Sequence, residues 1–292
     1  MADPVVSEQP VVDDDEFRGN YHVYEPYRAG LPRMKPYLRE LWRRREFLDE
    51  MARAKVRAEN MDTLFGRVWT VLSPLLTALT YFLLVLILTR GAGVENYLVF
   101  LLSGIFLFSI LQHAMSGGAK SVVGAGRMIT NTAFPRVMLP LAEVRLAWSE
   151  FWPTLIVLEV FLIGYRIPPH WAMLSLIPIF LMYLVLCSGV AMLLATCQVF
   201  FRDTRSFVPF VSRIWMYASP VLWTPGQVPG ELKSLEWLNP MYAITAAWSN
   251  AIVNGTWPPA STYITAAIWS FGLFALGAYV FLSRERDFAV RI

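Results

Sequence analysis

The sequence is short of charged residues, cysteines and histidines, and each shortage excludes a class of protein. Charged residues make up 16% of the 292 residues, whereas a soluble domain carries about a quarter, so a soluble globular protein is excluded. The two cysteines, Cys187 and Cys197, lie within apolar sequence and imply no disulfide framework. The three histidines, His22, His113 and His170, are scattered along the chain, and this spacing does not predict a metal site.

Two catalytic motifs are also missing. The chain has no Gly-x-x-x-x-Gly-Lys-Ser/Thr phosphate loop, because the stretch Gly118-Ala119-Lys120-Ser121 lacks the Gly-Lys pair and a preceding strand. It has no Gly-x-Ser-x-Gly nucleophile elbow either. We therefore predict that the chain is not an enzyme, hydrolyses no ATP by itself and holds no cofactor.

The N-terminal residues 1–20 contain no basic segment followed by an apolar core, so they do not predict a cleaved signal peptide. Their proline and acidic content is typical of disorder. We expect a largely disordered tail over 1–33 and one transmembrane domain over 34–290.

Hydrophobic residues, in contrast, make up 56% of the chain, and the mean hydropathy is positive. Six apolar segments are long enough to cross about 30 Å of hydrocarbon as helices. The predicted spans are 68–89, 97–114, 141–164, 172–199, 207–224 and 260–282. A further apolar segment, 225–259, is interrupted by prolines and predicts two short re-entrant outer helices, about 228–238 and 240–254. The sequence therefore predicts an all-α polytopic membrane protein.

An amphipathic stretch precedes the first span. Between residues 34 and 58, Met34, Leu38, Leu41 and Leu48 recur at helical spacing, and charged side chains occupy the other faces. This pattern predicts a helix that lies in the plane of the lipid headgroups.

The basic residues fall almost entirely on one side of the predicted spans. Only Arg90, Arg166 and Lys233 lie on the other side. The positive-inside rule therefore predicts a multi-pass protein of the cytoplasmic membrane with both termini in the cytoplasm.

The third predicted span carries Glu143, Arg145, Glu150 and Glu159, which are not aligned across the bilayer and therefore do not favour a proton relay. We expect Glu143 and Arg145 at the cytoplasmic boundary and Glu150 paired with a neighbouring helix.

Four short motifs occur in order between residues 35 and 290. They are Gly66-x-x-Trp69-x-x-x-x-Pro74-Leu75, Phe134-Pro135-Arg136-Val137-x-Leu139-Pro140, Phe201-Arg202-Asp203 and Asn239-Pro240-Met241. Because the four motifs occur in this order and on these predicted sides of the membrane, the chain resembles the ABC-2 type permeases of polysaccharide exporters, the Wzm family. A composition rich in Ala, Arg and Trp, with an acidic tail, favours an actinobacterial, mycobacterial-type galactan exporter within it.

The resemblance implies a channel-forming permease subunit that moves a lipid-linked polysaccharide across the membrane. It implies a homodimer in a lipid membrane, bound to two copies of a separate ABC ATPase. The ATPase would carry the ATP and Mg, and no nucleic-acid partner is implied. By resemblance, the two cytoplasmic loops, 115–140 and 200–206, would hold short coupling helices that contact the ATPase. The candidate coupling residues are Lys120, Arg127, Phe134, Arg136, Arg202 and Asp203. For Arg136 and Arg202, simple anchoring by positive charge is the alternative.

Two further residue sets follow from this function. Sugars bind to aromatic faces, so the candidate channel residues are Tyr81, Phe82, Trp215, Tyr217 and Trp223; an interfacial aromatic belt is the alternative. The candidates for meeting a lipid diphosphate are Arg43, Arg44 and Arg45, because a guanidinium forms paired hydrogen bonds with phosphate. Lipid anchoring is their alternative.

Other functions stay open on the sequence alone. The substrate could be galactan, O-antigen or teichoic acid. A permease of the same superfamily that exports a drug or lipid is the nearest alternative. An intramembrane enzyme lacks a nucleophile and base at matching depth, and a secondary transporter would need internal repeats.

Overall fold

The computed structural model describes residues 31–60, 66–88, 96–224 and 235–291, and every regular element in these ranges is a helix. The prediction of an all-α polytopic membrane protein is confirmed. Most of the expected tail, the first part of the outer segment 225–259, and Arg90 and Lys233 lie outside the described residues.

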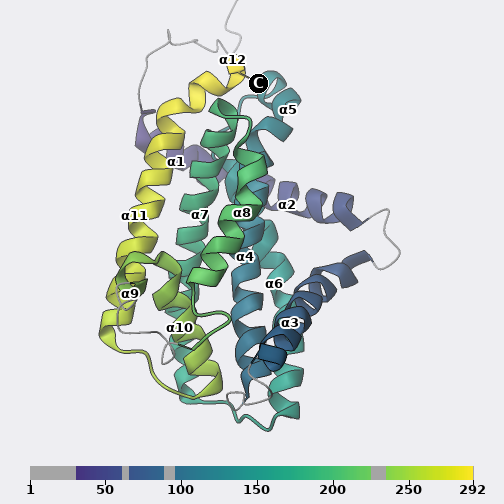
Figure 1. The fold of residues 1–292 in the computed structure, drawn as a ribbon. Coiled ribbons are helices and arrows are strands. Elements are labelled where there is room, and N and C mark those ends of the chain that lie inside the picture. The colour runs from purple at the N-terminus through teal and green to yellow at the C-terminus, as the bar shows by residue number, and fades with distance from the viewer. Residues whose placement is uncertain (1–30, 61–65, 89–95, 225–234, 292) are drawn as a thin grey trace, which may run out of the picture. The chain divides into compact units, whose positions relative to one another are not determined.

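Four long helices form the centre of the bundle: α4 (Tyr97–Gly124), α6 (Met138–Gly164), α7 (Leu176–Phe200) and α11 (Ala260–Arg284). Helix α4 packs against both α6 and α7, and α7 also packs along α11 (Figure 1). Most side chains of α4 are buried, which explains why its apolar residues surround the helix instead of forming one stripe.

Two glycines allow α7 and α11 to approach closely. A methyl group added at Gly189 of α7 would lie 2.5 Å from the carbonyl oxygen of Leu273 in α11, and one added at Gly277 would collide with the backbone of Gly189. Real Cβ atoms do not come that close, so side chains larger than hydrogen would separate the two helices.

Two helices at the bundle surface differ from the central four. Helix α3 (Trp69–Leu88) buries little beyond Ala78 and exposes Leu79, Leu83 and Ile87, as a helix facing lipid or another chain would. Helix α8 (Thr204–Ala218) has only 15 residues, shorter than the predicted span 207–224. Five helices of the described ranges are long and apolar enough to cross a membrane, and the count of six stays a prediction.

The helix predicted over residues 34–58 is present as two consecutive helices, α1 (Met34–Arg43) and α2 (Arg45–Asn60), which meet at Arg44. Their position at the level of the lipid headgroups stays a prediction. Helix α2 packs across α6 and buries Met51 and Ala52 (Figure 1). Helix α3 follows, beginning after the short turn η1 (Gly66–Val68).

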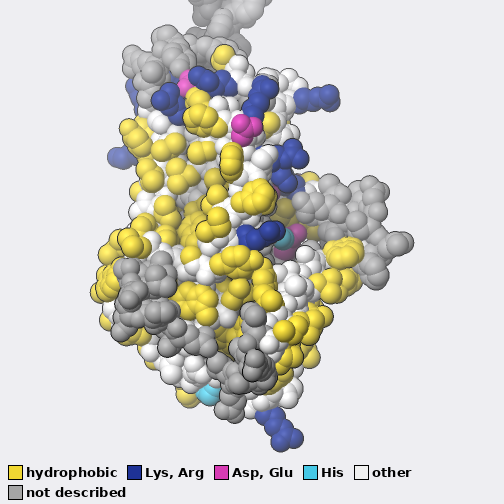
Figure 2. Space-filling view, in the orientation of Figure 1, with side chains coloured by type: hydrophobic (Ala, Val, Ile, Leu, Met, Phe, Trp, Pro, Cys, Tyr) yellow, Lys and Arg dark blue, Asp and Glu magenta, His cyan; other side chains and the backbone are white. Residues whose placement is uncertain are grey.

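A second apolar cluster, separate from the main core, forms at the end of the bundle near the C-terminus. It joins α1 and α2 to α5 (Gly126–Asn131) and α12 (Phe288–Arg291). The short turn η5 (Glu285–Asp287) connects α11 to α12. Figure 2 shows Lys and Arg side chains gathered at this end and beside α2, and a wide apolar surface farther along the bundle.

The opposite end carries short helices: η2 (Trp171–Ser175), α9 (Leu235–Leu238) and α10 (Pro240–Val253). Asn239 begins α10 by accepting a hydrogen bond from the Met241 amide at 3.0 Å. Its side-chain nitrogen donates to the Ala218 carbonyl at 2.8 Å, so the Asn-Pro-Met motif fastens the last turn of α8 to the start of α10.

One predicted loop is partly helical. The sequence placed the end of the second span at residue 114 and a loop over 115–140, but α4 continues to Gly124. The glycines that suggested a loop permit close packing instead: a Cβ at Gly118 would lie 2.8 Å from the Ala191 Cα of α7. The short helix expected within the loop is present as α5.

Candidate functional site

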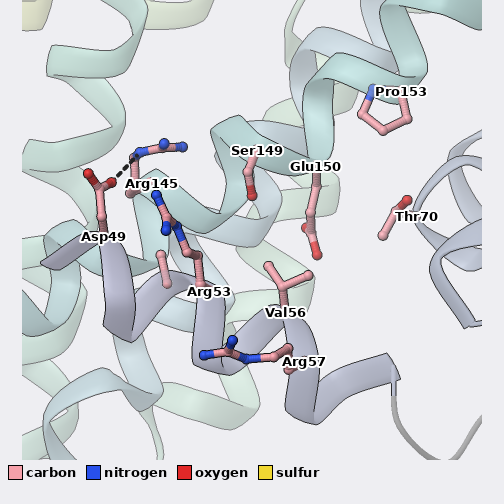
Figure 3. Close-up of a pocket in the computed structure, with 10 residues that line it drawn as sticks. Asp49, Arg53, Val56, Arg57, Thr70, Arg145, Ser149, Glu150 and Pro153 are labelled. Carbon is pink, nitrogen blue, oxygen red and sulfur yellow. Dashed lines mark hydrogen bonds and ion pairs between the residues drawn. The ribbon is translucent and has the colours of Figure 1, made fainter. Parts of the chain in front are cut away.

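A charged cleft opens where α2 crosses the bundle. Its main cavity, of about 400 Å³, lies between α2 and α6, with Thr70 of α3 at its edge (Figure 3). A second cavity of about 440 Å³ and a third of about 210 Å³ adjoin it, and all three share Glu150 of α6. We call this set of cavities the α2 cleft. Its charged lining residues are Asp49, Arg53, Lys55, Arg57, His113, Lys120, Glu143, Arg145 and Glu150.

Ion pairs connect the helices around the cleft. Lys55 of α2 pairs with the buried Glu143 of α6. Arg145 of α6 donates through Nε to Asp49 Oδ1 of α2 at 2.9 Å.

Glu150 Oε2 lies 2.6 Å from His113 Nδ1 of α4, so the expectation that Glu150 pairs with a neighbouring helix is confirmed. The charges of Glu143, Arg145 and Glu150 thus connect α6 to α2 and α4.

Arginines dominate the main cavity. Arg145 and Arg57 each have a carboxylate partner, Asp49 and Glu50 respectively. Arg53 is exposed on α2 and pairs with no acidic side chain in the described ranges. In Figure 3, the Arg53 side chain extends from α2 toward Arg145 of α6, whereas the Arg57 side chain runs back along α2, where it pairs with Glu50. Such a cavity offers guanidinium donors to an anion, and a guanidinium can bind a phosphate through two parallel hydrogen bonds.

The basic triplet of the α1–α2 corner does not form one cluster. Arg43 bonds to Glu40 at 3.1 Å. Arg44 bonds to the same carboxylate and donates through Nη1 to the Ala133 carbonyl at 2.8 Å. Arg45 lies over the Trp42 ring, 5.2 Å from its centroid. The hydrogen bond from Arg44, with the charge of Arg43 nearby, lowers the pKa of Glu40.

Three of the five predicted channel aromatics come together. The hydroxyls of Tyr81 in α3 and Tyr217 in α8 lie 3.1 Å apart, and Trp223 donates through Nε1 to the Tyr217 carbonyl at 2.9 Å. Phe82 stacks on Tyr97 of α4. Trp215 instead donates to Asn239 at 2.8 Å. Whether this group lines a channel stays a prediction.

The predicted coupling residues lie in three places: the α2 cleft, the stretch from α5 to the start of α6, and the turn between α7 and α8. Lys120 lies in the α2 cleft. Arg127 is exposed on α5, and Phe134 packs against Phe47 of α2 with ring centroids 5.8 Å apart. Arg136 contacts Glu285, both through its backbone and through its guanidinium.

Arg202 and Asp203 are exposed in the α7–α8 turn, which Gln198 braces. The Gln198 side chain donates to the Arg202 carbonyl at 2.9 Å and accepts from the Arg205 amide at 2.6 Å. Contact of any of these residues with an ATPase stays a prediction.

Sequence reasoning missed several residues of these sites. The sequence indicates an amphipathic helix over residues 34–58 but predicts no site role for Arg53, Arg57 or Tyr37 within it. Glu285, in the basic C-terminal segment, gave no signal at all. These roles depend on which helix packs on which, and that information is not local in sequence.

The fold and the cleft define a class: an α-helical polytopic membrane protein in which a surface helix pair precedes the first span and borders a charged cavity. No protein-family model matches the chain. Three curated relatives, however, are similar to it over most of its length, and each is an O-antigen export system permease protein RfbA.

Two of the relatives come from Klebsiella pneumoniae. One is 29% identical over 196 residues, which cover 67% of this chain and 75% of the relative. The other is 28% identical over 195 residues, 66% of this chain and 75% of the relative. A relative from Myxococcus xanthus is 26% identical over 257 residues, 87% of this chain and 98% of the relative. The resemblance to Wzm-type ABC-2 permeases that the motifs indicate is confirmed by these relatives.

Proposed function

We propose that this chain is the channel-forming permease subunit of an ATP-driven exporter that moves a lipid-linked polysaccharide out across the cytoplasmic membrane. It works as a homodimer with two copies of an ABC ATPase. The three O-antigen permeases support this function. They support a polysaccharide substrate, and both an O-antigen-like glycan and a galactan stay candidates.

The observation that carries the proposal is the arginine-lined cavity between α2 and α6. A lipid-linked glycan places a diphosphate at the headgroup level, beside the apolar chain of its lipid carrier. Helix α2 lies along that level in our reading, and its cavity offers Arg53 and Arg57 together with Arg145. Arginine binds phosphate through two parallel hydrogen bonds, so this cavity suits the linkage of such a substrate.

The corner triplet would make the first contact with the substrate. The guanidinium of Arg43 is largely exposed, with 74% of its side chain accessible, and Arg45 is exposed as well. A diphosphate attracted there can move along α2 to Arg53. The aromatic group of Tyr81, Tyr217 and Trp223 then offers ring faces to the sugars that follow, in the helices α3 and α8 at the bundle surface.

The test uses the full chain purified with its candidate ATPase and reconstituted in lipid nanodiscs. We expect a lipid-linked O-antigen fragment to stimulate ATP hydrolysis. A galactan-bearing lipid is the second probe, and a drug-like amphiphile is the third. Absence of stimulation by both glycans would contradict polysaccharide export, and stimulation by the amphiphile alone would favour a drug or lipid exporter.

Charge reversal locates the entry site. Replacing Arg43, Arg44 and Arg45 with Glu should abolish export in cells and leave the dimer assembled, and Arg53→Glu should weaken the stimulation by lipid-linked glycan. Arg39→Glu is the matched control, because Arg39 is exposed on α1 and lines none of the cavities of the α2 cleft. Unaltered export after reversal of the triplet would exclude its role in substrate entry.

A further inference from the structure

Glu285 is a buried carboxylate at the end of the last long helix. It begins η5, directly after α11, and only 9% of its surface is accessible. A carboxylate in such a position needs hydrogen-bond donors to offset its desolvation. The donors come from two other parts of the chain, far from Glu285 in sequence.

The first donor is Tyr37 of α1. Its hydroxyl lies 3.1 Å from Glu285 Oε1 and 2.9 Å from Oε2. Burial of the phenol, together with the neighbouring carboxylate, raises the pKa of Tyr37 well above its ordinary value. The hydroxyl therefore remains protonated at neutral pH and stays a donor.

The second set of donors comes from the segment between α5 and α6. The Arg136 amide donates to Glu285 Oε1 at 2.6 Å, and the Arg136 guanidinium donates to the Glu285 carbonyl oxygen. One carboxylate thus binds a surface helix and the start of α6 at the same time.

The same segment, residues 132–137, holds the surface helices at two more points. The Ala133 carbonyl accepts from Arg44 at the α1–α2 corner, and the Phe134 ring packs edge-on against Phe47 of α2. Helix α5 directly precedes this segment. A displacement of α5 therefore reaches α1 and α2 through three contacts, made by Ala133, Phe134 and Arg136. The contact of Arg136 with Glu285 is the one of these three that also involves the end of α11.

We propose that Glu285 is a positioning residue that makes the helix pair α1–α2 move together with α5 and residues 132–137, so that ATPase movement at α5 changes the α2 cleft. The driving force rests on the function proposed above, since an ATPase must contact α5. The mechanical connection is a property of this chain alone. Two sites coupled in this way typically influence each other 5- to 150-fold.

Two variants test this connection between helices. A third variant separates the effect of the Glu285 hydrogen bonds from the effect of the Glu285 charge. Tyr37→Phe removes one hydroxyl and keeps the ring, and Glu285→Ala removes the acceptor. Glu285→Gln retains an oxygen that can accept from both Tyr37 and the Arg136 amide, so it should behave nearly as the unmodified chain. Glu46→Gln is the matched control, because Glu46 is exposed on α2.

The first measurement needs no ATPase. Amide hydrogen exchange of the full chain in nanodiscs should become faster in α1 for Tyr37→Phe and Glu285→Ala and should stay unchanged in the central part of α6. Unchanged exchange in α1 would overturn the proposal. Because Tyr37→Phe keeps the ring in the apolar cluster, it retains a folded chain even if Glu285→Ala does not.

The second measurement uses the complex with the ATPase. For Tyr37→Phe we expect basal ATP hydrolysis within about twofold of the unmodified complex and a loss of export of about tenfold. Faster exchange in α1 with full export would overturn the transmission role. If the unmodified complex shows no stimulation by lipid-linked glycan, the proposed function fails, and the exchange measurement still decides the role of Glu285.

Discussion

At the scale of single residues, the charges of α6 are explained by partners on adjacent helices. Glu143 and Glu150 would each cost several kcal/mol if they were ionised and unpaired in an apolar environment. Lys55 and His113 supply the partners from α2 and α4. The same pairs keep the α2 cleft polar, and a polar cavity of this size can hold water and admit an anionic group.

A substitution at Lys55 should show how tightly this network holds α2. Glu143 packs directly against the backbone of α4, where a Cβ added at Gly117 would lie 2.7 Å from Glu143 Oε2. We expect Lys55→Met to destabilise the chain by about 1–3 kcal/mol, since it leaves a buried acceptor unpaired and Lys55 itself is only partly buried. The measurement is thermal unfolding in detergent, followed by size-exclusion chromatography.

The second arm of this experiment is the double variant Lys55→Met with Glu143→Gln. It should recover part of the lost stability, because a neutral amide costs less to bury than a carboxylate. Lys35→Met, at an exposed position of α1, is the control. A single variant that unfolds at the same temperature as the unmodified chain would show that the pair contributes nothing.

At the scale of elements, the packing of α7 on α11 depends on backbone contact at Gly189 and Gly277. We expect Gly277→Ala to destabilise the chain by about 1–3 kcal/mol, as overpacked cores are, since the methyl group would collide with the Gly189 backbone. The readout is the temperature at which the monodisperse peak is lost in fluorescence-detected size-exclusion chromatography.

Gly272→Ala is the control for this prediction. It lies on the same helix, and an added Cβ there has no neighbouring atom within 4 Å. Alanine also favours the helix over glycine, so this variant should be neutral or slightly stabilising. Equal effects of the two substitutions would exclude the close α7–α11 approach.

Comparison of the predicted spans with the helix bounds in the structure shows which helix ends the sequence could predict. The first and third spans lie close to their predicted ranges, because long apolar runs identify helices by composition alone. The end of α4 was missed because its glycines indicate a loop locally, whereas they serve packing on α7. Helix α8 ends before Ser219 and Pro220, and a residue before proline avoids helical backbone angles.

The candidate site was harder to predict than the spans. The motif residue Arg136 was identified, but its contact with Glu285 depends on the meeting of chain segments 149 residues apart. Arg53 became a candidate only once α2 was seen to lie across α6. Residue type and spacing indicate a surface helix, and they carry no information on what that helix covers.

At the scale of the whole described molecule, the positions of the helix ends require one membrane crossing in addition to the five long helices. Phe200 is the last residue of α7, and the guanidinium groups of Arg284 and Arg291 lie over its ring. Helix α7 therefore ends at the same end of the bundle as α12. Gly255, just before α11, contacts His170 at the other end. Because α11 returns from that end to the first, the chain between Phe200 and Gly255 must cross the bundle through α8 and α10.

Helix α8 alone is too short for this crossing. Its 15 residues extend about 22 Å, and the hydrocarbon of a bilayer is about 30 Å thick. Residues 219–224, which follow Ala218, form no helix, and non-helical backbone is tolerated at membrane depth only where protein covers it. Ser219 and Val221 are fully buried, as this requires. We therefore expect six crossings, of which five are long helices.

Cysteine labelling tests this topology. In a background of Cys187→Ala and Cys197→Ala, single cysteines replace Arg205, at the start of α8, and Trp257, which is 59% exposed between α10 and α11. A membrane-impermeant maleimide should label Trp257→Cys in right-side-out vesicles and Arg205→Cys only in inside-out vesicles, because the positive-inside rule predicts that the basic end faces the cytoplasm. Labelling of both from one side would mean that α8 does not cross, and the reverse pattern would mean that the basic end faces outward.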